Sequence, residues 1–535
     1  MDSLHHRLDN LGASIQELMR LGGTPGLSLS VATKGQPIYH ASYGVRDLET
    51  ALPVTENTIF PVCSLAKTVS AAAMGILVEQ GVSSWEMLAK DAVPGFKPRD
   101  ETLEKLTTLA DLFSHRSGMS SCGNLVMGCE GNVLIGRDDC LRVVNNQVLV
   151  PAQLGSFAYN STAYDLCGEA IENLSGSSMD DFIQAHIFNP LGMDRTFLTS
   201  PPDDIDDVSK SYNALDDATP VRIPSPKLGD NGVGGASGGL RSCASDLIRL
   251  YSSFLTSFNH EFETDQTLTP GSPLKQVSHL MSAKVPMFKT ARNEISYGLG
   301  WARVQLPNTL GHIGLNGRLM PGGMPVVGRG VPSQLVLYHQ GTLPGALAVV
   351  LLVPETESVI LVMSNCLSLT DVPDWVSQMV LEVVLGVPAL ERIDFLRYAE
   401  SSIAANLQWH SCIVGGLEQG RSGAMEPHMD LKLYVGTYID DIGVFKNVVT
   451  LENGKLSWAF QGLDSEKFEL AHYDGDKFTW LQPRNVLSRR GRWVLGNDKD
   501  PAFWIADFRS NERGNVTTLL WRHDPTLDPI IYWKR

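Results

Sequence analysis

The hydrophobic pattern of the first fifty residues predicts one helix followed by a β-hairpin. Residues 4–21 repeat apolar side chains at the spacing of an amphipathic helix, and a glycine pair follows that would end it. Residues 26–32 and 37–41 alternate with a period of two instead, and a Lys-Gly turn lies between them. The chain therefore begins with a helix and two paired strands.

Further along, apolar segments predict three more helices and three buried strands. The predicted helices cover residues 66–79, 165–174 and 178–188. The predicted strands cover residues 334–338, 346–353 and 359–363. Helices on both sides of short apolar strands indicate a mixed α and β core.

Two long segments lack any regular pattern. Residues 201–235 are dense in Pro, Asp and Gly, and residues 308–332 contain seven glycines. Loops of this length inside a compact domain are commonly lids or binding loops, so we expect both near a site. Leu319, Met320 and Met324 could give the second loop an adaptable apolar wall, and a purely structural loop is the alternative.

From residue 431 onward the pattern is that of an all-β domain. Short aromatic runs alternate with turns rich in Gly, Asn and Asp, which predicts a small closed barrel or sandwich. We expect a catalytic domain over residues 1–400, a linker over 401–428 and a β domain over 429–535.

Composition excludes several classes of protein. The 535 residues are 43% hydrophobic and 19% charged, as in soluble globular proteins. A net charge of -16 argues against nucleic-acid binding, which needs basic patches to displace phosphate counterions. The start has no apolar signal segment, and the apolar run 346–353 is too short to span a membrane, so we expect no membrane partner and a cytoplasmic location.

The eight cysteines show neither CxxC pairs nor zinc-ligand spacing. We expect reduced thiols, with a local disulfide among Cys122, Cys129 and Cys140 as the alternative. No phosphate-binding glycine loop or dinucleotide fingerprint is present, so we expect no metal and no cofactor.

The most specific chemical feature is Ser64, followed three residues later by Lys67 at the start of the predicted helix 66–79. If Ser64 opens this helix, Lys67 lies one turn later on the same face, within reach of the hydroxyl. A serine becomes a nucleophile when a base takes its proton, and a lysine with a pKa lowered by burial can be that base. The Ser64 N–H at the helix start would also stabilise a developing oxyanion.

A second Ser-x-x-Lys sequence occurs at Ser272 and Lys275, because short motifs recur by chance. Only Ser64 is followed along the chain by two further sequence motifs that could complete a catalytic site. In the first, Tyr159 precedes the predicted helix 165–174 and could act as general acid or base, although a buried core tyrosine is the commoner case.

The second element is the end of the predicted strand 334–338. Gly341 would let a substrate approach the strand edge, and the Thr342 N–H could be a second oxyanion donor. A histidine or glycine at a strand end is more often structural, so only the combination with Ser64 favours a site.

These motifs resemble the serine β-lactamase and penicillin-binding-protein superfamily, and most of all its class C branch with the related esterases and acyltransferases. The order and approximate spacing match in Ser64-x-x-Lys67, Tyr159-x-Ser161 and His339-x-Gly341. Further matching segments are 111–118, 189–193, 235–240 and 297–301. The resemblance covers about residues 10–370.

The resemblance implies an α+β, β-lactamase/transpeptidase-like fold: an antiparallel sheet flanked by helices, a helical subdomain, and a site in the cleft between them. It implies Ser64 as the acylated nucleophile, Lys67 and Tyr159 as the proton-transfer pair, and the amides of Ser64 and Thr342 as the oxyanion hole. The expected substrate-binding residues are Ser161, His339, Gln340 and Gly341. The C-terminal all-β barrel-like segment resembles the lipocalin-like domain of some relatives, which would either border the cleft or only stabilise the protein.

Two departures from the family pattern bear on the substrate. Class C β-lactamases usually have Asn where Ser161 stands, and penicillin-recognising members have Lys where His339 stands. Because histidine is largely neutral at pH 7, we expect a pocket without a fixed cation that binds anionic β-lactams weakly. The expected function is a serine esterase, thioesterase or acyltransferase that forms a Ser64 acyl-enzyme on a small apolar ester or thioester, by analogy in metabolite biosynthesis.

Other functions remain open at this stage. The expected partner is a small-molecule acyl substrate, with a carrier-protein or CoA thioester as a candidate donor. A D-amino-acid peptidase or β-lactamase is the alternative enzyme, and a sensor or binding module acylated once is the alternative without turnover. The sequence leaves open hydrolysis against transfer and the oligomeric state.

Overall fold

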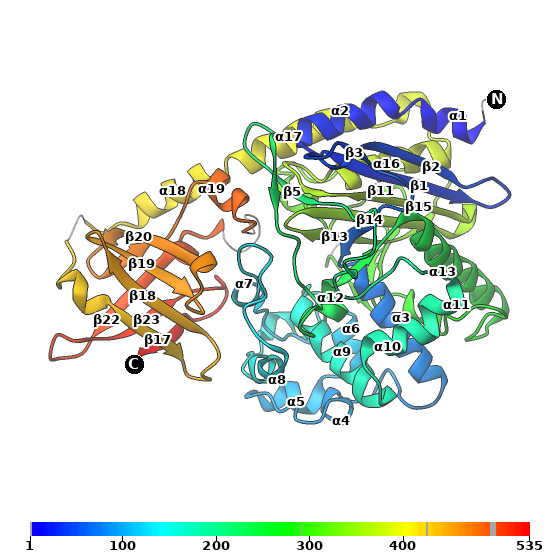
Figure 1. Cartoon of the computed structure of the whole chain (residues 1–535). Coiled ribbons are helices and arrows are strands. Elements are labelled where there is room, and N and C mark those ends of the chain that lie inside the picture. Colours follow the sequence, from blue (N-terminus) through cyan, green and yellow to red (C-terminus); the bar gives the residue numbers. More distant parts are fainter. Residues whose placement is uncertain (1–2, 290, 424–425, 493–498) are drawn as a thin grey trace.

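The structure, a computed structural model, describes residues 3–289, 291–423, 426–492 and 499–535. Figure 1 shows a large unit of mixed helices and strands and a smaller barrel formed by the C-terminal segment. Two consecutive helices, α17 (Phe395–Leu407) and α18 (Trp409–Gly420), run from the large unit to the barrel.

Nine described strands form an antiparallel sheet in the middle of the large unit, in the order β3-β2-β1-β15-β14-β13-β10-β9-β8. Their bounds are β1 Gly26–Thr33, β2 Tyr39–Asp47, β3 Leu52–Pro53, β8 Val285–Pro286, β9 Ile295–Tyr297, β10 Ala302–Gln305, β13 Leu335–Leu343, β14 Ala346–Val353 and β15 Ser358–Ser364. The predicted N-terminal hairpin is present, and β1 pairs with β15 from the far end of the unit. This pairing joins the two ends of the catalytic sequence in one sheet.

Side chains of the central strands alternate between two cores, which explains their uninterrupted apolar sequences. In β15, Ile360 faces one core and Leu361 the other. Helix α16 (Val372–Leu385) packs on β14 and β15 in the first core, and α13 (Ala244–Thr264) packs on β15 and β1 in the second. Both faces of the strand are buried, so neither face tolerates a run of polar residues.

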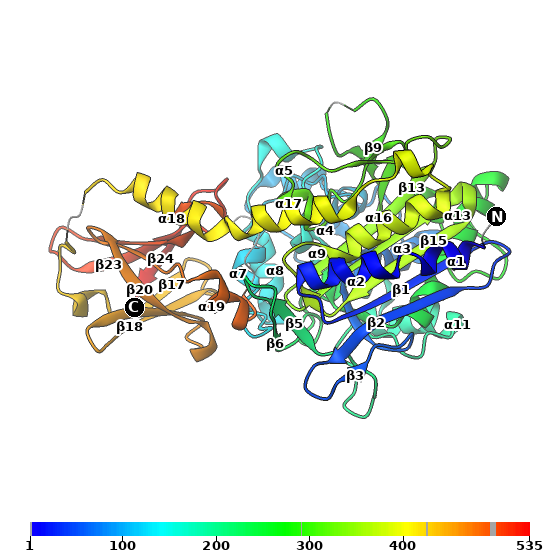
Figure 2. The same cartoon turned by 90° about the horizontal axis from the view of Figure 1, so that it is seen from above.

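The predicted helix over residues 4–21 is two helices, because the chain turns at Asn10 and Leu11. They are α1 (Leu4–Asp9) and α2 (Gly12–Gly22). Together with α16 and α17 they cover one face of the sheet, as the view from above shows (Figure 2).

A helical subdomain covers the other face. The three helices predicted there are α3 (Ala66–Glu79), α9 (Ser161–Ser175) and α10 (Met179–Ile183), the last continuing as a π-helical turn, Gln184–Phe188. The shorter helices on this side are α4 Ala89–Ala92, α5 Glu101–Leu106, α6 Leu109–Phe113, α7 Gly123–Val126, α8 Arg137–Asn145, α11 Asn189–Leu191, α12 Gly235–Gly238 and α14 Val277–Leu280. The large unit therefore has the helix–sheet–helix layering that the resemblance implies.

Both segments without a sequence pattern contain short elements. Residues 201–235 hold β5 (Ser211–Ala214) and β6 (Pro220–Ile223), and β5 also pairs in parallel with β16 (Cys366–Leu367). Residues 308–332 hold β11 Asn308–Thr309, α15 Asn316–Leu319 and β12 Val326–Val327. Elements of two to four residues are too short to leave a periodic pattern, so the sequence did not indicate them.

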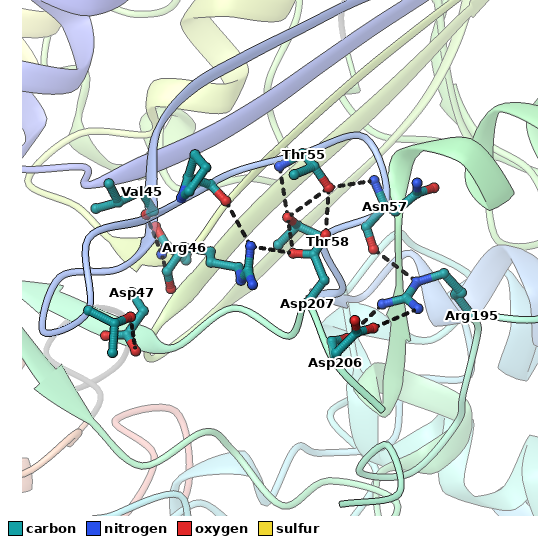
Figure 3. A network of polar contacts seen from close by, with 12 residues as sticks. Val45, Arg46, Asp47, Thr55, Asn57, Thr58, Arg195, Asp206 and Asp207 are labelled. Atoms are coloured by element: carbon teal, nitrogen blue, oxygen red, sulfur yellow. Dashed lines mark hydrogen bonds and ion pairs between the residues drawn. The ribbon is translucent and has the colours of Figure 1, made fainter. Parts of the chain in front are cut away.

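A polar network fixes the start of the segment 201–235 (Figure 3). The Asp207 carboxylate accepts hydrogen bonds from the Thr55 and Thr58 hydroxyls, both at 2.5 Å, and forms an ion pair with Arg46 at 3.1 Å. Nearby, Arg195 Nη2 donates to the Asp206 carbonyl over 2.7 Å. These contacts join the segment to the chain that follows β2.

Replacing Asp207 with alanine is expected to lower the free energy of unfolding by about 2 kcal/mol, because Arg46 and two hydroxyls lose their acceptor. Urea denaturation followed by tryptophan fluorescence measures the change. The matched control is Asp206→Ala, because that side chain is 91% exposed, and its effect should stay within about 0.5 kcal/mol. Equal effects of the two substitutions would contradict the role of the network.

Eight described strands, β17 to β24, close into a barrel at the C-terminus. Their bounds are β17 Gly436–Asp440, β18 Lys446–Glu452, β19 Lys455–Phe460, β20 Lys467–Asp474, β21 Lys477–Thr479, β22 Ile505–Ser510, β23 Val516–Trp521 and β24 Ile530–Lys534, with α19 Arg484–Arg489 beside them. The aromatic runs of the sequence fill its interior, where Trp458, Trp480, Trp504 and Trp521 are fully buried. In the described part of the predicted linker 401–428, α17 and α18 occupy most of the chain.

The eight cysteines are free, and Cys122, Cys129 and Cys140 are buried without a disulfide between them. Burial raises the pKa of the Cys122 and Cys129 thiols to about 12, so both stay protonated and unreactive at neutral pH. In the described parts of the chain, no helix combines the length and the apolar character that crossing a membrane requires.

Candidate active site

Ser64 lies on the tight turn between a short strand, β4 (Phe60–Cys63), and α3. Cys63 has a φ of 54°, a left-handed conformation that turns the chain sharply just before the serine. Lys67 follows in the first turn of α3, and its Nζ donates to Ser64 Oγ over 3.1 Å. The structure thus brings together the two side chains that the sequence analysis paired.

Lys67 is fully buried, although Ser64 is partly accessible. Burial lowers the pKa of Lys67 to about 7, and the nearby Asp165 carboxylate opposes that shift. Lys67 Nζ also donates to the Ser237 carbonyl over 2.7 Å, which orients the amine. A large fraction of the amine is therefore neutral at pH 7 and able to accept the serine proton.

Tyr159 lies beside this pair, directly before α9. Its ring centroid is 5.0 Å from Lys67 Nζ, and the side chains of Ser64 and Ser161 lie close enough to oppose part of the rise in its pKa. Burial raises the pKa of Tyr159 above its usual value, so the phenol stays protonated at neutral pH. In this arrangement the protonated Tyr159 can donate a proton and then regain one, whereas the neutral Lys67 amine is the base that takes the serine proton.

Strand β13 passes close to the nucleophile. A Cβ atom on Gly341 would lie 2.4 Å from the Val62 carbonyl oxygen and 3.3 Å from the Ser64 nitrogen, so only glycine permits this approach. Thr342 and Ser64 line the same cavity. Their backbone amides are thus the candidates for an oxyanion hole.

The other candidates for substrate binding differ in their access to the cavity. Ser161 and Gln340 line it, whereas the His339 side chain is fully buried and is not among its lining residues. His339 Nε2 is 3.0 Å from the Tyr297 hydroxyl and Nδ1 is 2.8 Å from the Gln340 carbonyl. Burial and the charge of Lys67 lower the pKa of His339 to about 3, so this histidine is neutral and supplies no cation.

The cavity above Ser64 has a volume of about 310 Å³. Its apolar lining residues include Val126, Met127, Leu228, Val233, Ile313, Leu315 and Leu343. Both long segments reach it, but Leu319, Met320 and Met324 do not line it as predicted, because they pack into the two cores instead. Ile313 and Leu315 make the wall of the second segment.

Four charged lining residues, Asp165, Arg318, Arg492 and Asp524, were not predicted from the sequence. Asp165 accepts a hydrogen bond from the Gly234 N–H over 2.8 Å, and burial raises its pKa to about 7. Arg318 from α15 and Arg492 from the C-terminal domain also line the cavity. The expectation of a pocket without a fixed cation is therefore wrong, because cations reach the cavity from α15 and from the C-terminal domain rather than from β13. Asp165 lies four residues after Ser161, a helical spacing that could have indicated it.

The second Ser-x-x-Lys sequence lacks both the contact between lysine and serine hydroxyl and the access to the cavity. Lys275 Nζ donates to the carbonyl of Ser272 over 2.9 Å rather than to its hydroxyl. The Ser272 hydroxyl is held by Ser253 and Ser257 and does not line the cavity. It has the contacts of a structural serine.

Comparisons with known proteins match both units of the chain. Residues 11–379 match the model of the Beta-lactamase family, and residues 421–531 match a domain of unknown function, DUF3471. Penicillin-binding protein 4 of Amycolatopsis lactamdurans is 31% identical over 33% of this chain and 45% of its own length. Esterase EstB of Burkholderia gladioli is 29% identical over 38% of this chain and 53% of its own length. The chain thus spans about half of each of these relatives.

Among solved structures, the octameric penicillin-binding protein homologue from Pyrococcus abyssi has the same fold. The likeness covers 98% of this chain and 99% of that one, with a TM-score of 0.57 and 20% identity. The likeness therefore includes the C-terminal barrel as well as the large unit. The family model covers more than two thirds of the sequence, and the chain belongs to the Beta-lactamase family of serine hydrolases.

Proposed function

We propose that this protein is an esterase, thioesterase or acyltransferase that forms an acyl-enzyme at Ser64. The observation that carries the proposal is the 3.1 Å contact between Ser64 Oγ and Lys67 Nζ at the cavity wall. A buried lysine whose pKa lies near 7 is a base matched to neutral pH. The Ser64–Lys67 pair supports the proposed enzyme class and reaction, and the lining of the cavity supports the proposed class of substrate.

Acylation requires three linked proton transfers. Lys67 takes the Ser64 hydroxyl proton while Oγ bonds to the substrate carbonyl carbon, and the carbonyl electron pair moves onto oxygen facing the amides of Ser64 and Thr342. On collapse, the bond from carbon to the leaving oxygen or sulfur breaks. Tyr159 gives its proton to that atom and regains one from the Lys67 ammonium. Water or another nucleophile then releases the acyl group and restores Ser64.

The cavity supports a small acyl group that is mainly apolar. Seven of its lining side chains are aliphatic or thioether groups, and a volume of about 310 Å³ is at the small end for ligand pockets. The neutral His339 stands where penicillin-recognising relatives have a lysine, so β13 offers no ammonium to a β-lactam carboxylate. Esterase EstB, one of the relatives, carries an activity of this kind in its name.

The test is to incubate the protein with short-chain esters and thioesters, a chromogenic cephalosporin and a D-alanine amide, and to follow both turnover and intact mass. We expect a transient Ser64 acyl adduct and multiple turnovers with the esters or thioesters. Faster turnover of the cephalosporin or the amide would favour a β-lactamase or peptidase. One equivalent of adduct without release would favour an acylated sensor.

A further inference from the structure

The C-terminal barrel forms part of the wall of the Ser64 cavity. Arg492, Phe503 and Asp524 from this domain line the cavity together with residues of the catalytic domain. Arg492 Nη1 donates to the Met127 carbonyl, next to α7, over 2.7 Å. Both views show α7 between the two units (Figures 1 and 2). The substrate site is thus built by two domains.

The barrel is held against the catalytic domain by buried polar contacts. The Glu466 carboxylate, fully buried, accepts hydrogen bonds from the Cys129 N–H over 2.7 Å and from Asn132 Nδ2 over 2.9 Å. A second contact lies beside β5, where Asn213 Nδ2 donates to the Ser488 carbonyl over 2.9 Å. Contacts at two separate places fix the orientation of the barrel, so Arg492 has a defined position in the wall.

Arg492 is a buried cation whose hydrogen-bonding capacity is largely unused. Arg492 as a whole is only 3% exposed, and its guanidinium lies 5.7 Å from the Trp480 ring centroid. Among the described residues, the bond to the Met127 carbonyl is the one hydrogen bond of the guanidinium, and no carboxylate forms an ion pair with it. A guanidinium can donate five N–H bonds, and a buried charge without a counter-ion is costly. An anion in the cavity would meet both requirements.

Arg318 approaches the cavity from the opposite domain. It lies on α15, which Asn316 anchors through a 2.8 Å hydrogen bond to the Asp374 carboxylate. Its charge opposes part of the rise that burial causes in the pKa of Tyr159, so the guanidinium lies toward the catalytic end of the cavity. Lys499 of the C-terminal domain donates to the Arg318 carbonyl over 3.2 Å, which ties α15 to the barrel side.

We propose that Arg318 and Arg492 bind an anionic group of the substrate, such as a carboxylate on the acyl chain or on the leaving group. Guanidinium groups recognise such anions through paired, charge-assisted hydrogen bonds. The cavity also contains two carboxylates, but Asp165 accepts from the Gly234 N–H near Lys67, and Asp524 accepts from Thr526. The inference deepens the proposed function and rests on it: the barrel selects ester or thioester substrates that carry a negative charge.

The experiment compares matched pairs of esters by the initial rate of Ser64 acylation, measured by intact mass. One pair is 4-nitrophenyl hydrogen glutarate and 4-nitrophenyl valerate, with the charge on the acyl chain. The other is 4-(valeryloxy)benzoate and its methyl ester, with the charge on the leaving group. The 535-residue protein should prefer the anionic member of at least one pair by about tenfold or more, since a charge-assisted hydrogen bond is worth at least that factor.

Arg492→Met and Arg318→Met should each remove most of this preference, and Arg513→Met should retain it. Arg513 is the matched control because it is an exposed arginine of the same domain, in the turn between β22 and β23. If Arg492→Met does not fold, Arg318→Met on the exposed surface of α15 tests the same site. Equal rates within both pairs, or an unchanged preference in the arginine variants, would overturn the inference and leave the proposed function standing. Absence of acylation by every ester would instead overturn the proposed function.

Discussion

Ser64→Ala is expected to abolish acylation, with a fall of at least about 10⁴-fold in the rate of ester turnover. The loss should be this large because the hydroxyl is the atom that bonds to the substrate, and among the described residues it is the one hydroxyl that is hydrogen-bonded to Lys67 Nζ. Intact mass after treatment with a fluorophosphonate and with a short-chain thioester measures the loss directly. Wild type should gain one adduct, and the variant none.

The matched control is Ser272→Ala, in the second Ser-x-x-Lys sequence. Its hydroxyl is bonded to Ser253 and Ser257 outside the cavity, so the variant should be labelled like wild type. Labelling that survives in Ser64→Ala but disappears in Ser272→Ala would show that the wrong serine had been chosen. Peptide mapping of the labelled residue gives the same answer independently.

The sequence predicted the centre of this site because its members are linked by local geometry. Ser64 and Lys67 lie one helical turn apart, and the turn before α3 places both on the same side. Gly341 was predicted for the same kind of reason, since a close approach of two backbones requires glycine. The strands around it were predicted because β14 and β15 are apolar on both faces.

Residues that reach the cavity from distant segments left no such signal. Arg318 lies on a helix of four residues inside a glycine-rich segment, and Arg492 comes from another domain, 428 positions after Ser64. Nothing local distinguishes either arginine from the many exposed ones. The inference of a cation-free pocket from His339 alone was therefore wrong, although the structure does make His339 neutral. Residues that come together only through tertiary packing can be identified as neighbours only in the folded structure.

Lys67→Met is expected to lower the rate of acylation by about 10²–10⁴-fold, because it removes the general base and leaves the Ser64 hydroxyl protonated. In wild type the rate should rise with pH through about 7, as the Lys67 ammonium with its pKa of about 7 loses its proton. The methionine variant should lack this rise between about pH 6 and pH 8. Stopped-flow release of 4-nitrophenolate, measured across this range, reports both quantities.

Two further variants show whether the rise belongs to Lys67. Lys275→Met, in the second Ser-x-x-Lys sequence, should keep the wild-type profile, because its ammonium bonds only to the Ser272 carbonyl among the described residues. Asp165→Asn should move the rise to lower pH, since the Asp165 carboxylate raises the pKa of Lys67 and the amide does not. Asp165 itself has a pKa of about 7, so the wild-type profile reports the coupled pair, and the asparagine variant should give a simpler curve. A rise that persists unchanged in Lys67→Met would assign the base to another group.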